Sequence, residues 1–282
     1  MFSRIATLIF VILVAATIGG APPDAHAAAN VTESEKLEAL LGEFWEDFLM
    51  RSPITATGVG DPRYNDQFPN SLTEEWRIES RAFNEHWLDR LSTLDRNALH
   101  DQDRLSYDIV NRDLKSNLEG LEYPGHLLPI SPLFSVPTFL ARLGSGTAMQ
   151  PFRTVKDYDD FLKRLDGGLE WIDQAIVNMR EGVERGIVQP RVVMEKVVPQ
   201  LDNLIVAQAE DSVFWGAIEK FPEDFSEADK SRLSEAYRGA IGDKVMPAYV
   251  RLRDFISEEY LPECRESVGL SALPDGMDWY AY

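Results

Sequence analysis

Apolar side chains recur along this chain at the spacing of an α-helix, and this periodicity restricts the folds that the chain can adopt. In residues 32–50, TESEKLEALLGEFWEDFLM, the apolar side chains follow one another at steps of three and four residues. Such steps place them on one face of an amphipathic helix, which must be buried against a neighbour. The face consists of Leu37, Leu40, Leu41, Phe44, Trp45, Phe48 and Leu49.

The same periodicity predicts several further helices, and no stretch alternates apolar and polar residues as a strand would. The predicted helices cover about 71–94, 98–118, 154–185, 190–208 and 227–260, and the second of these has Leu105, Ile109, Leu114 and Leu118 on its apolar face. Pairs suited to N-terminal caps are Thr32 with Glu35, Ser71 with Glu74, Thr154 with Asp157, and Ser226 with Asp229. We therefore expect an all-α, elongated multi-helix domain of antiparallel and kinked helices over residues 28–282. The aromatic stripes of its first two helices should pack together.

Proline and glycine predict irregularities inside three of these helices. Pro199 and Pro247 lack a backbone N–H, so a kink is expected at each. Gly167 and Gly168 interrupt the longest helix, where a bend or a close contact with another segment would explain them.

Residues 120–153 interrupt the helical pattern. The segment is apolar but contains five prolines, so it cannot be one helix. A long apolar segment must find cover, because it would otherwise expose its side chains to water. We expect it to be irregular and to pack over a cleft or across the helix layer.

The first 30 residues have the pattern of a secretory signal peptide. Arg4 precedes an apolar run over residues 5–18, and the motif Ala-His-Ala ends at Ala27. We predict cleavage between Ala27 and Ala28, and a periplasmic or secreted mature protein. The alternative is an uncleaved membrane anchor, but the run is short for a span of about 20 residues.

The charge of the chain excludes one class of partner. The formal net charge is -19, whereas binding to nucleic acid requires clustered Lys and Arg. We therefore expect no nucleic-acid partner, and no membrane association once the signal peptide is removed. Cys264 is the single cysteine of the sequence, so an intrachain disulfide is impossible.

The histidines do not form a recognisable metal motif. A zinc peptidase helix of the HExxH type needs two His four residues apart. Of the four histidines, His26 lies in the signal peptide, and His86, His100 and His126 are not followed by such a partner. We interpret His86 and His100 as solvated helix residues and assign no metal ligand to this chain.

Nucleophilic chemistry has no better support. Ser145 lies in Gly-Ser-Gly without the Gly-x-Ser-x-Gly elbow, so a turn is the simpler interpretation. Cys264 has Arg265 beside it but no histidine partner in the sequence, which favours a structural thiol. The acidic runs 157–160 and 223–229 are typical of solvated helix starts. We assign no catalytic residue and no substrate-binding residue.

Four stretches, taken in order, resemble the bacterial family catalogued as domain of unknown function 885. They are SPITATGVGDPRYNDQFPN (52–70), LHDQDRLSYDIVNRDL (99–114), the stretch from TVKDYDD to QLDNLI (154–205), and the stretch from VMPAYV to DWYAY (245–282). The resemblance covers nearly all of residues 35–282. It implies a mostly helical, exported protein that is similar to thermolysin-like zinc metallopeptidases and about twice as long as this chain.

In that family the HExxH helix and a further Glu ligand lie in the C-terminal half, so the resemblance places zinc outside this chain. The aromatic residues after Pro274, among them Trp279, Tyr280 and Tyr282, have no evident terminating role, which suggests a chain cut before its catalytic half. By position, the segments from Phe134 to Phe152 and from Arg185 to Arg191 are candidates for the wall of a cleft, with plain packing as the alternative.

Three hypotheses about function remain open. The first is a non-catalytic N-terminal part of an exported zinc metallopeptidase-like protein, which is inactive alone and has an apolar face for its own C-terminal half. In this hypothesis a peptide substrate binds only to the assembled protein. The second is a free-standing periplasmic helical binding or interaction module. The third is a metal-independent hydrolase that uses a pair of carboxylates.

Overall fold

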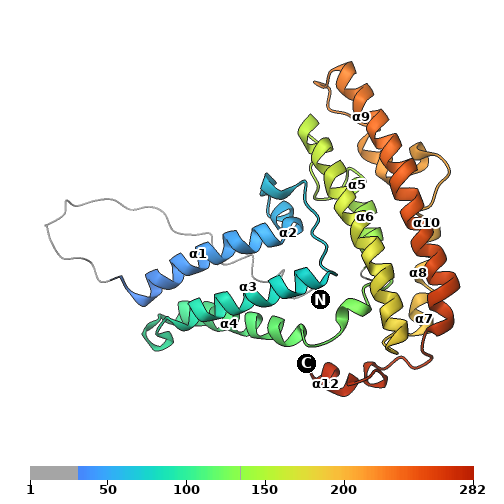
Figure 1. The fold of residues 1–282 in the computed structure, drawn as a ribbon. Coiled ribbons are helices and arrows are strands. Elements are labelled where there is room, and N and C mark those ends of the chain that lie inside the picture. The colour runs from blue at the N-terminus through green and yellow to red at the C-terminus, as the bar shows by residue number, and fades with distance from the viewer. Residues whose placement is uncertain (1–30, 134) are drawn as a thin grey trace. The chain divides into compact units, whose positions relative to one another are not determined.

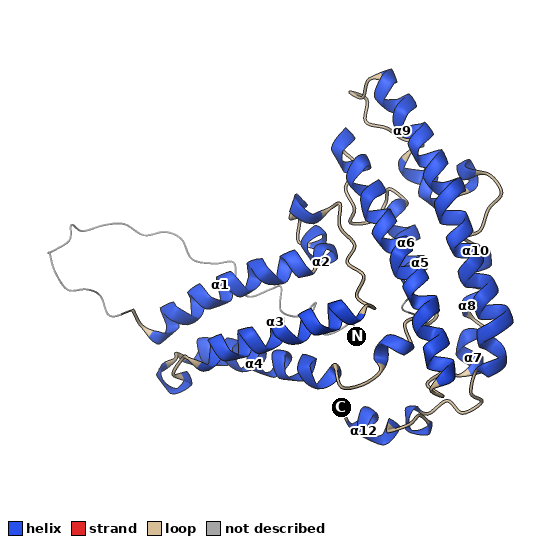
Figure 2. Ribbon diagram, in the orientation of Figure 1, coloured by secondary structure: helices blue, strands red, loops and turns tan. Residues whose placement is uncertain are grey.

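The computed structural model describes residues 31–133 and 135–282, and the compact unit extends from Glu33 to Tyr282. The described residues form helices and loops without a β-strand, which confirms the all-α prediction (Figures 1 and 2). The predicted signal peptide, residues 1–27, and its cleavage site between Ala27 and Ala28 lie outside the described residues.

The α-helices are α1 Glu33–Arg51, α2 Pro53–Gly58, α3 Glu74–Ser92, α4 Asp101–Gly120, α5 Val136–Gly144, α6 Val155–Glu184, α7 Arg191–Met194, α8 Val197–Asp202, α9 Glu227–Gly239, α10 Met246–Asp254, α11 Leu261–Glu263 and α12 Gly276–Ala281. Short 3-10 helices are η2 Pro62–Tyr64, η3 Arg96–Ala98, η4 Gly125–Leu127, η5 Ala209–Asp211, η6 Val213–Ala217 and η9 Leu270–Ala272. Two segments are π-helical, η7 Ala240–Val245 and η8 Phe255–Tyr260.

Helices α1, α3 and α4 share one hydrophobic cluster. Its buried members are Leu37, Leu40, Trp87, Leu91, Leu94, Leu99, Val110 and Leu114. The ring of Phe44 in α1 lies 6.0 Å from that of Phe83 and 5.4 Å from that of Trp87, both in α3. The prediction that the aromatic stripes of the first two helices pack together is therefore confirmed.

Two details of these helices were predicted wrongly. Helix α3 is capped by Thr73, whose hydroxyl accepts a hydrogen bond from the Trp76 N–H at 3.2 Å, and not by Ser71. On α4, Leu114 is buried as predicted, but Leu105 and Ile109 are exposed, and Val110, which was not predicted, is buried instead. The apolar face of α4 is thus rotated from the predicted one, because it is set by contact with α1 and α3 rather than by periodicity alone.

The segment over residues 120–153 is not irregular throughout. It contains α5, which begins with Val136 and Pro137, and a proline in the first turn of a helix removes no helical hydrogen bond. Leu140 and Leu143 of α5 are fully buried in the second hydrophobic cluster. The prolines therefore separate short elements of this segment, which packs into the core.

Helix α6 starts where the sequence predicts. Thr154 and Asp157 form a capping box, in which each side chain accepts a hydrogen bond from the other residue's backbone N–H. Gly167 and Gly168 both mark close contacts, as expected: an added Cβ would lie 2.6 Å from the Phe68 carbonyl oxygen and 2.5 Å from Leu140 Cδ1, respectively.

The helix predicted over residues 190–208 is instead two short helices, α7 and α8. The break falls at Glu195 and Lys196. Glu195 lies four residues before Pro199, and a proline ring clashes with the carbonyl at that position in a continuous helix. The expected kink therefore takes the form of a turn at these two residues, which keep helical φ and ψ but interrupt the α-helix.

Residues 227–263 form one long helix, α9–η7–α10–η8–α11, which is capped by the predicted Ser226 hydroxyl. The kink expected at Pro247 takes the form of a π-helical turn. Each π-helical segment ends directly before a helical segment whose second residue is a proline, Pro247 in α10 and Pro262 in α11. A π turn widens the helix, so it accommodates the proline ring and the missing N–H.

Four ion pairs connect α6 to this long helix. They are Asp159–Arg232, Asp166–Lys244, Asp173–Arg251 and Arg180–Glu259, with N···O distances of 2.6 to 2.8 Å. The members on α6 are seven residues apart, and their partners increase in number in the same order. The two helices therefore run in the same direction, whereas α3 and α4 are antiparallel, because Arg81 bonds Glu122 and Asn84 bonds Asn117.

The C-terminal segment packs against the end of α4. The ring of Tyr123 stacks on Trp279 at 6.0 Å and on Tyr282 at 5.2 Å. The aromatic residues after Pro274 thus have a structural role that the sequence did not indicate, although Tyr280 remains 75% exposed.

Candidate functional site

One side of α6 has a row of buried polar side chains. Arg164, Trp171 and Asn178 are seven residues apart, which places them on the same side of the helix after every two turns. All three are buried, and each donates hydrogen bonds to segments that precede α6 in the chain. We call the contacts of these three side chains with residues 53–126 and Gln150 the α6 seam.

Arg164 forms the most buried part of the seam. Its side chain is fully buried, and its guanidinium donates to four neutral oxygen atoms. These are the carbonyls of Tyr64 at 2.6 Å, Gln67 at 3.0 Å and Pro53 at 3.4 Å, and the Gln150 side-chain oxygen at 2.6 Å. Burial lowers the pKa of Arg164 to about 10. The bonds hold the connection between α2 and α3 against α6.

Trp171 forms the middle of the seam. Its indole N–H donates to the Ser71 hydroxyl at 3.1 Å. Ser71, predicted as a helix cap, therefore contributes to the seam instead. Gly167 lies one turn earlier on α6, and its missing side chain leaves the space that the Phe68 carbonyl occupies.

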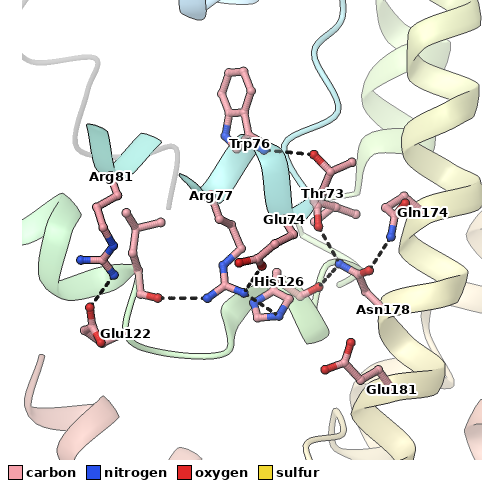
Figure 3. A network of polar contacts seen from close by, with 12 residues as sticks. Thr73, Glu74, Trp76, Arg77, Arg81, Glu122, His126, Gln174, Asn178 and Glu181 are labelled. Atoms are coloured by element: carbon pink, nitrogen blue, oxygen red, sulfur yellow. Dashed lines mark hydrogen bonds and ion pairs between the residues drawn. The ribbon is translucent and has the colours of Figure 1, made fainter. Parts of the chain in front are cut away.

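Asn178 forms the other end of the seam, which Figure 3 shows at close range. Its amide nitrogen donates to the carbonyl of Leu72 at 3.0 Å and to that of His126 at 3.2 Å. Its amide oxygen accepts from the Gln174 amide at 2.8 Å. The Asn178 side chain therefore joins the start of α3 and η4 to one position of α6.

Arg77 of α3 determines the protonation state of the neighbouring His126 ring. A guanidinium N–H of Arg77 lies 3.3 Å from His126 Nε2, and a guanidinium can only donate. His126 Nε2 must therefore accept, so the ring is neutral with its proton on Nδ1. Burial, and secondly the Arg77 charge, lower the pKa of His126. The same guanidinium donates to Glu74 at 3.1 Å and to the Leu121 carbonyl at 3.3 Å.

A shallow hollow of about 270 Å³ lies beside this end of the seam. Its lining consists of Glu74, Arg77, Ile78, Arg81, Ala82, Glu85 and Leu121. Arg77 and Arg81 are paired with Glu74 and Glu122. The charges that face the hollow are thus largely compensated within the chain.

The polar side chains of the seam connect segments of the fold and do not form a reaction centre. The lone pair of His126 Nε2 is engaged by Arg77, so the ring would have to lose this bond before it took a proton or bound a metal. Arg164 and Asn178 bind backbone carbonyls and not a side-chain nucleophile. The seam fixes the start of α3 and η4 on α6.

Two of the other histidines lie on the surface of the described part of the chain. His86 and His100 are both exposed, in agreement with their interpretation as solvated residues. Within residues 31–133 and 135–282, no three His, Cys, Asp or Glu side chains lie together so that they could hold a metal ion.

None of the helices described has a stretch that is long and apolar enough to cross a bilayer.

The two candidate nucleophiles have structural surroundings. The Ser145 hydroxyl donates to the Arg142 carbonyl at 2.8 Å and contacts the Thr147 hydroxyl, as expected for a turn. Cys264 is buried, and burial raises the pKa of its thiol to about 11. In the acidic run 157–160, Asp160 is buried and bonded to Lys156, which corrects its interpretation as a solvated helix start.

The two cleft candidates are packed against the rest of the chain. Phe134 lies outside the described residues, and Phe152 contacts the rings of Tyr158 and Phe161. In the turn from Arg185 to Arg191, Ile187 and Val188 are buried. That these stretches also border a cleft stays a prediction.

The sequence contained a signal for the seam that periodicity did not use. Arg164 follows Phe161 by three residues and precedes Leu165, so it lies on the apolar face of α6. Asn178 directly precedes the buried Met179. A charged or amide side chain on the buried face of a long helix indicates a polar partner there, although its identity does not follow from sequence.

Comparison with protein families decides the relationship of the chain. The model of the family described as "Bacterial protein of unknown function (DUF885)" matches residues 53–282. The chain belongs to this DUF885 family. The resemblance inferred from four stretches of sequence is thereby confirmed at the level of the family. No curated protein matches the DUF885 chain in sequence.

A solved structure shares the fold of this DUF885 chain. It is a crystal structure described as that of the "putative lipoprotein from Colwellia psychrerythraea", with a TM-score of 0.70 and 15% sequence identity. The match covers 89% of this chain and 45% of the other. The chain thus spans less than half the length of that protein.

Proposed function

We propose that this chain is the non-catalytic, cleft-covering N-terminal part of an exported zinc metallopeptidase-like protein. The observation that supports this most is the match to the Colwellia psychrerythraea structure, in which nearly all of this chain corresponds to less than half of a longer helical protein. The helical architecture and the DUF885 membership agree with the resemblance on which the peptidase-like assignment rests.

In this proposal the chain contributes a rigid helical wall rather than reacting groups. The buried hydrogen bonds of the α6 seam and the ion pairs between α6 and the long helix would hold such a wall in place. The described residues do not fit a zinc ion: His86 and His100 are exposed and belong to no cluster of three potential ligands, and His126 Nε2 is bonded to Arg77. We therefore derive no step of peptide hydrolysis from these residues.

Export is part of the same proposal. The basic residue, apolar run and Ala-His-Ala motif at the N-terminus are typical of a signal peptide. The Colwellia psychrerythraea protein is described as a "putative lipoprotein", which is compatible with a family that functions outside the cytoplasm. We propose a periplasmic or secreted location after cleavage between Ala27 and Ala28.

The proposal is tested by metal analysis and peptidase assays on the purified chain. We expect less than stoichiometric zinc by mass spectrometry after incubation with excess zinc and gel filtration, and no hydrolysis of a mixed peptide library. One tightly bound zinc ion per chain, or cleavage that a chelator abolishes, would contradict a non-catalytic role.

A second candidate function is a free-standing periplasmic helical binding module. The observation in its favour is the stacking of Trp279 and Tyr282 on Tyr123, which gives the aromatic C-terminal segment a partner within this chain. This candidate predicts a monodisperse protein with one cooperative thermal transition. Aggregation of the purified chain, reversed by a co-expressed C-terminal half of a family member, would instead favour the first function.

A further inference from the structure

Residues 265–282 cross from the end of the long helix to the end of α4, and their first part is fixed on the core. The Arg265 guanidinium donates to the Val188 carbonyl at 2.9 Å and to the Gly269 carbonyl at 2.8 Å. The Arg265 carbonyl accepts from the Arg191 N–H at 2.9 Å. This end of the segment is thereby attached to the turn between α6 and α7.

The second part of the segment is attached to the end of α4 and to the connection between α4 and η4. Trp279 and Tyr282 stack on Tyr123, which lies between α4 and η4. The Tyr123 hydroxyl donates to the Asp278 carbonyl at 3.3 Å, and the Tyr282 hydroxyl donates to the Ser116 carbonyl at 3.0 Å. Figure 1 shows α12 near the end of α4. One segment thus connects the α6–α7 turn to the connection between α4 and η4.

The two ends of the α6 seam differ in how firmly they are held. At one end, Arg164 is fully buried and makes four hydrogen bonds. At the other end, Asn178 makes only two hydrogen bonds across the seam, to the carbonyls of Leu72 at 3.0 Å and His126 at 3.2 Å, and its amide carries no charge. Hydrogen bonds from a charged group stabilise more than those from a neutral amide, so the end with two amide bonds is held less firmly than the end with four guanidinium bonds. The Asn178 and His126 end is therefore the end at which the seam opens first.

We propose that residues 265–282 form a strap that closes the His126 end of the α6 seam, while Arg164 acts as the pivot. The strap holds the α4–η4 connection, and with it the start of α3, near the C-terminal end of α6. Release of the Tyr123 ring stack opens this end and leaves the Arg164 end in place. The strap consists of this chain's own residues and does not depend on the proposed function.

The attachment of α12 depends on a tight turn at Gly276. A Cβ atom at this position would lie 2.1 Å from the Leu270 carbonyl oxygen, a backbone atom that cannot rotate away. Gly276→Ala therefore displaces α12 without removing any aromatic ring. It provides a way to release the strap that is independent of a change in the stack.

The test is hydrogen–deuterium exchange, followed by mass spectrometry, on the wild type, Trp279→Ala and Gly276→Ala. In both variants we expect amides in residues 121–128 to exchange about threefold to tenfold faster, as loss of one aromatic pair implies. Amides in residues 53–67, at the Arg164 end, should exchange at the wild-type rate. The matched control is Tyr280→Ala, which removes an aromatic ring that is 75% exposed and should change neither region.

Two results would overturn the strap. One is unchanged exchange over residues 121–128 in both variants, which would mean that the stack does not hold this end closed. The other is equal acceleration at both ends of the seam in both variants, which would mean that the segment stabilises the whole chain without a pivot. If Trp279→Ala unfolds the protein, the comparison of Gly276→Ala with Tyr280→Ala decides between these outcomes.

Discussion

Replacing Arg164 by methionine removes the buried charge of the α6 seam while keeping a side chain of similar volume. Three of the hydrogen bonds that the guanidinium makes are 2.6 to 3.0 Å long, and the fourth, to Pro53, is 3.4 Å. Hydrogen bonds to charged groups each stabilise a protein by about 1.5 to 3 kcal/mol. Loss of the three short bonds therefore costs roughly 5 to 9 kcal/mol.

Part of this loss is offset because the buried charge is itself unfavourable. Burial lowers the pKa of Arg164 to about 10, and at about 1.4 kcal/mol per pKa unit this corresponds to roughly 3 kcal/mol. We therefore expect Arg164→Met to lower the free energy of unfolding by about 2 to 6 kcal/mol.

Urea denaturation followed by circular dichroism at 222 nm measures this change. The matched control is Lys163→Met on the preceding residue of α6, whose side chain is 66% exposed and lies 3.9 Å from Asp66. We expect the control to change the free energy of unfolding by less than about 1 kcal/mol. An Arg164→Met protein as stable as the control would refute the reasoning, because the seam would then not depend on its buried guanidinium.

Three further predictions concern other parts of the structure. The pKa of His126 in the folded protein lies below its unfolded value of 6.5, so its contribution to stability is complete above that pH and decreases as the pH falls. Between pH 7.5 and 5.5, the free energy of unfolding measured in urea should therefore fall less in His126→Gln than in the wild type. An equal fall in both proteins would contradict this assignment. Gly167→Ala should lower the melting temperature, because the added Cβ would lie 2.6 Å from the Phe68 carbonyl oxygen. Its control is Gly42→Ala in α1, where the space is open and the change should raise the free energy of unfolding by about 0.5 to 1 kcal/mol. Equal effects of the two substitutions would contradict the close contact at Gly167. Asp173→Asn, which breaks the half-exposed pair with Arg251, should lower the free energy of unfolding by less than about 1 kcal/mol in urea denaturation, and a larger loss would mean that this pair contributes more than an exposed ion pair does.

The sequence predicted correctly those elements that depend on local signals, such as capping residues and apolar periodicity. The Thr154 and Asp157 pair sets the start of α6 by itself, and Ser226 does the same for the long helix. The contact of Phe44 with α3 also follows, because an exposed aromatic stripe needs another such stripe to cover it.

Other features depend on contacts between distant segments and were not predictable in this way. Ser71 and Thr73 are equally good caps by composition, and the Trp171 indole, 100 residues away, uses the first of them. Whether Pro199 breaks a helix and Pro247 only widens one depends on the packing around each helix. The partners of Arg164 could not be inferred either, because backbone carbonyls have no signature in the sequence.

The proposed function is tested most directly by the DNA that follows the codon for Tyr282, read in all three frames. The account predicts a stretch that encodes HExxH and a further glutamate in one of the frames, because this chain is proposed to be the non-catalytic part of a longer metallopeptidase-like protein. Unrelated sequence in every frame would contradict the account, and the free-standing binding module would then be the better description.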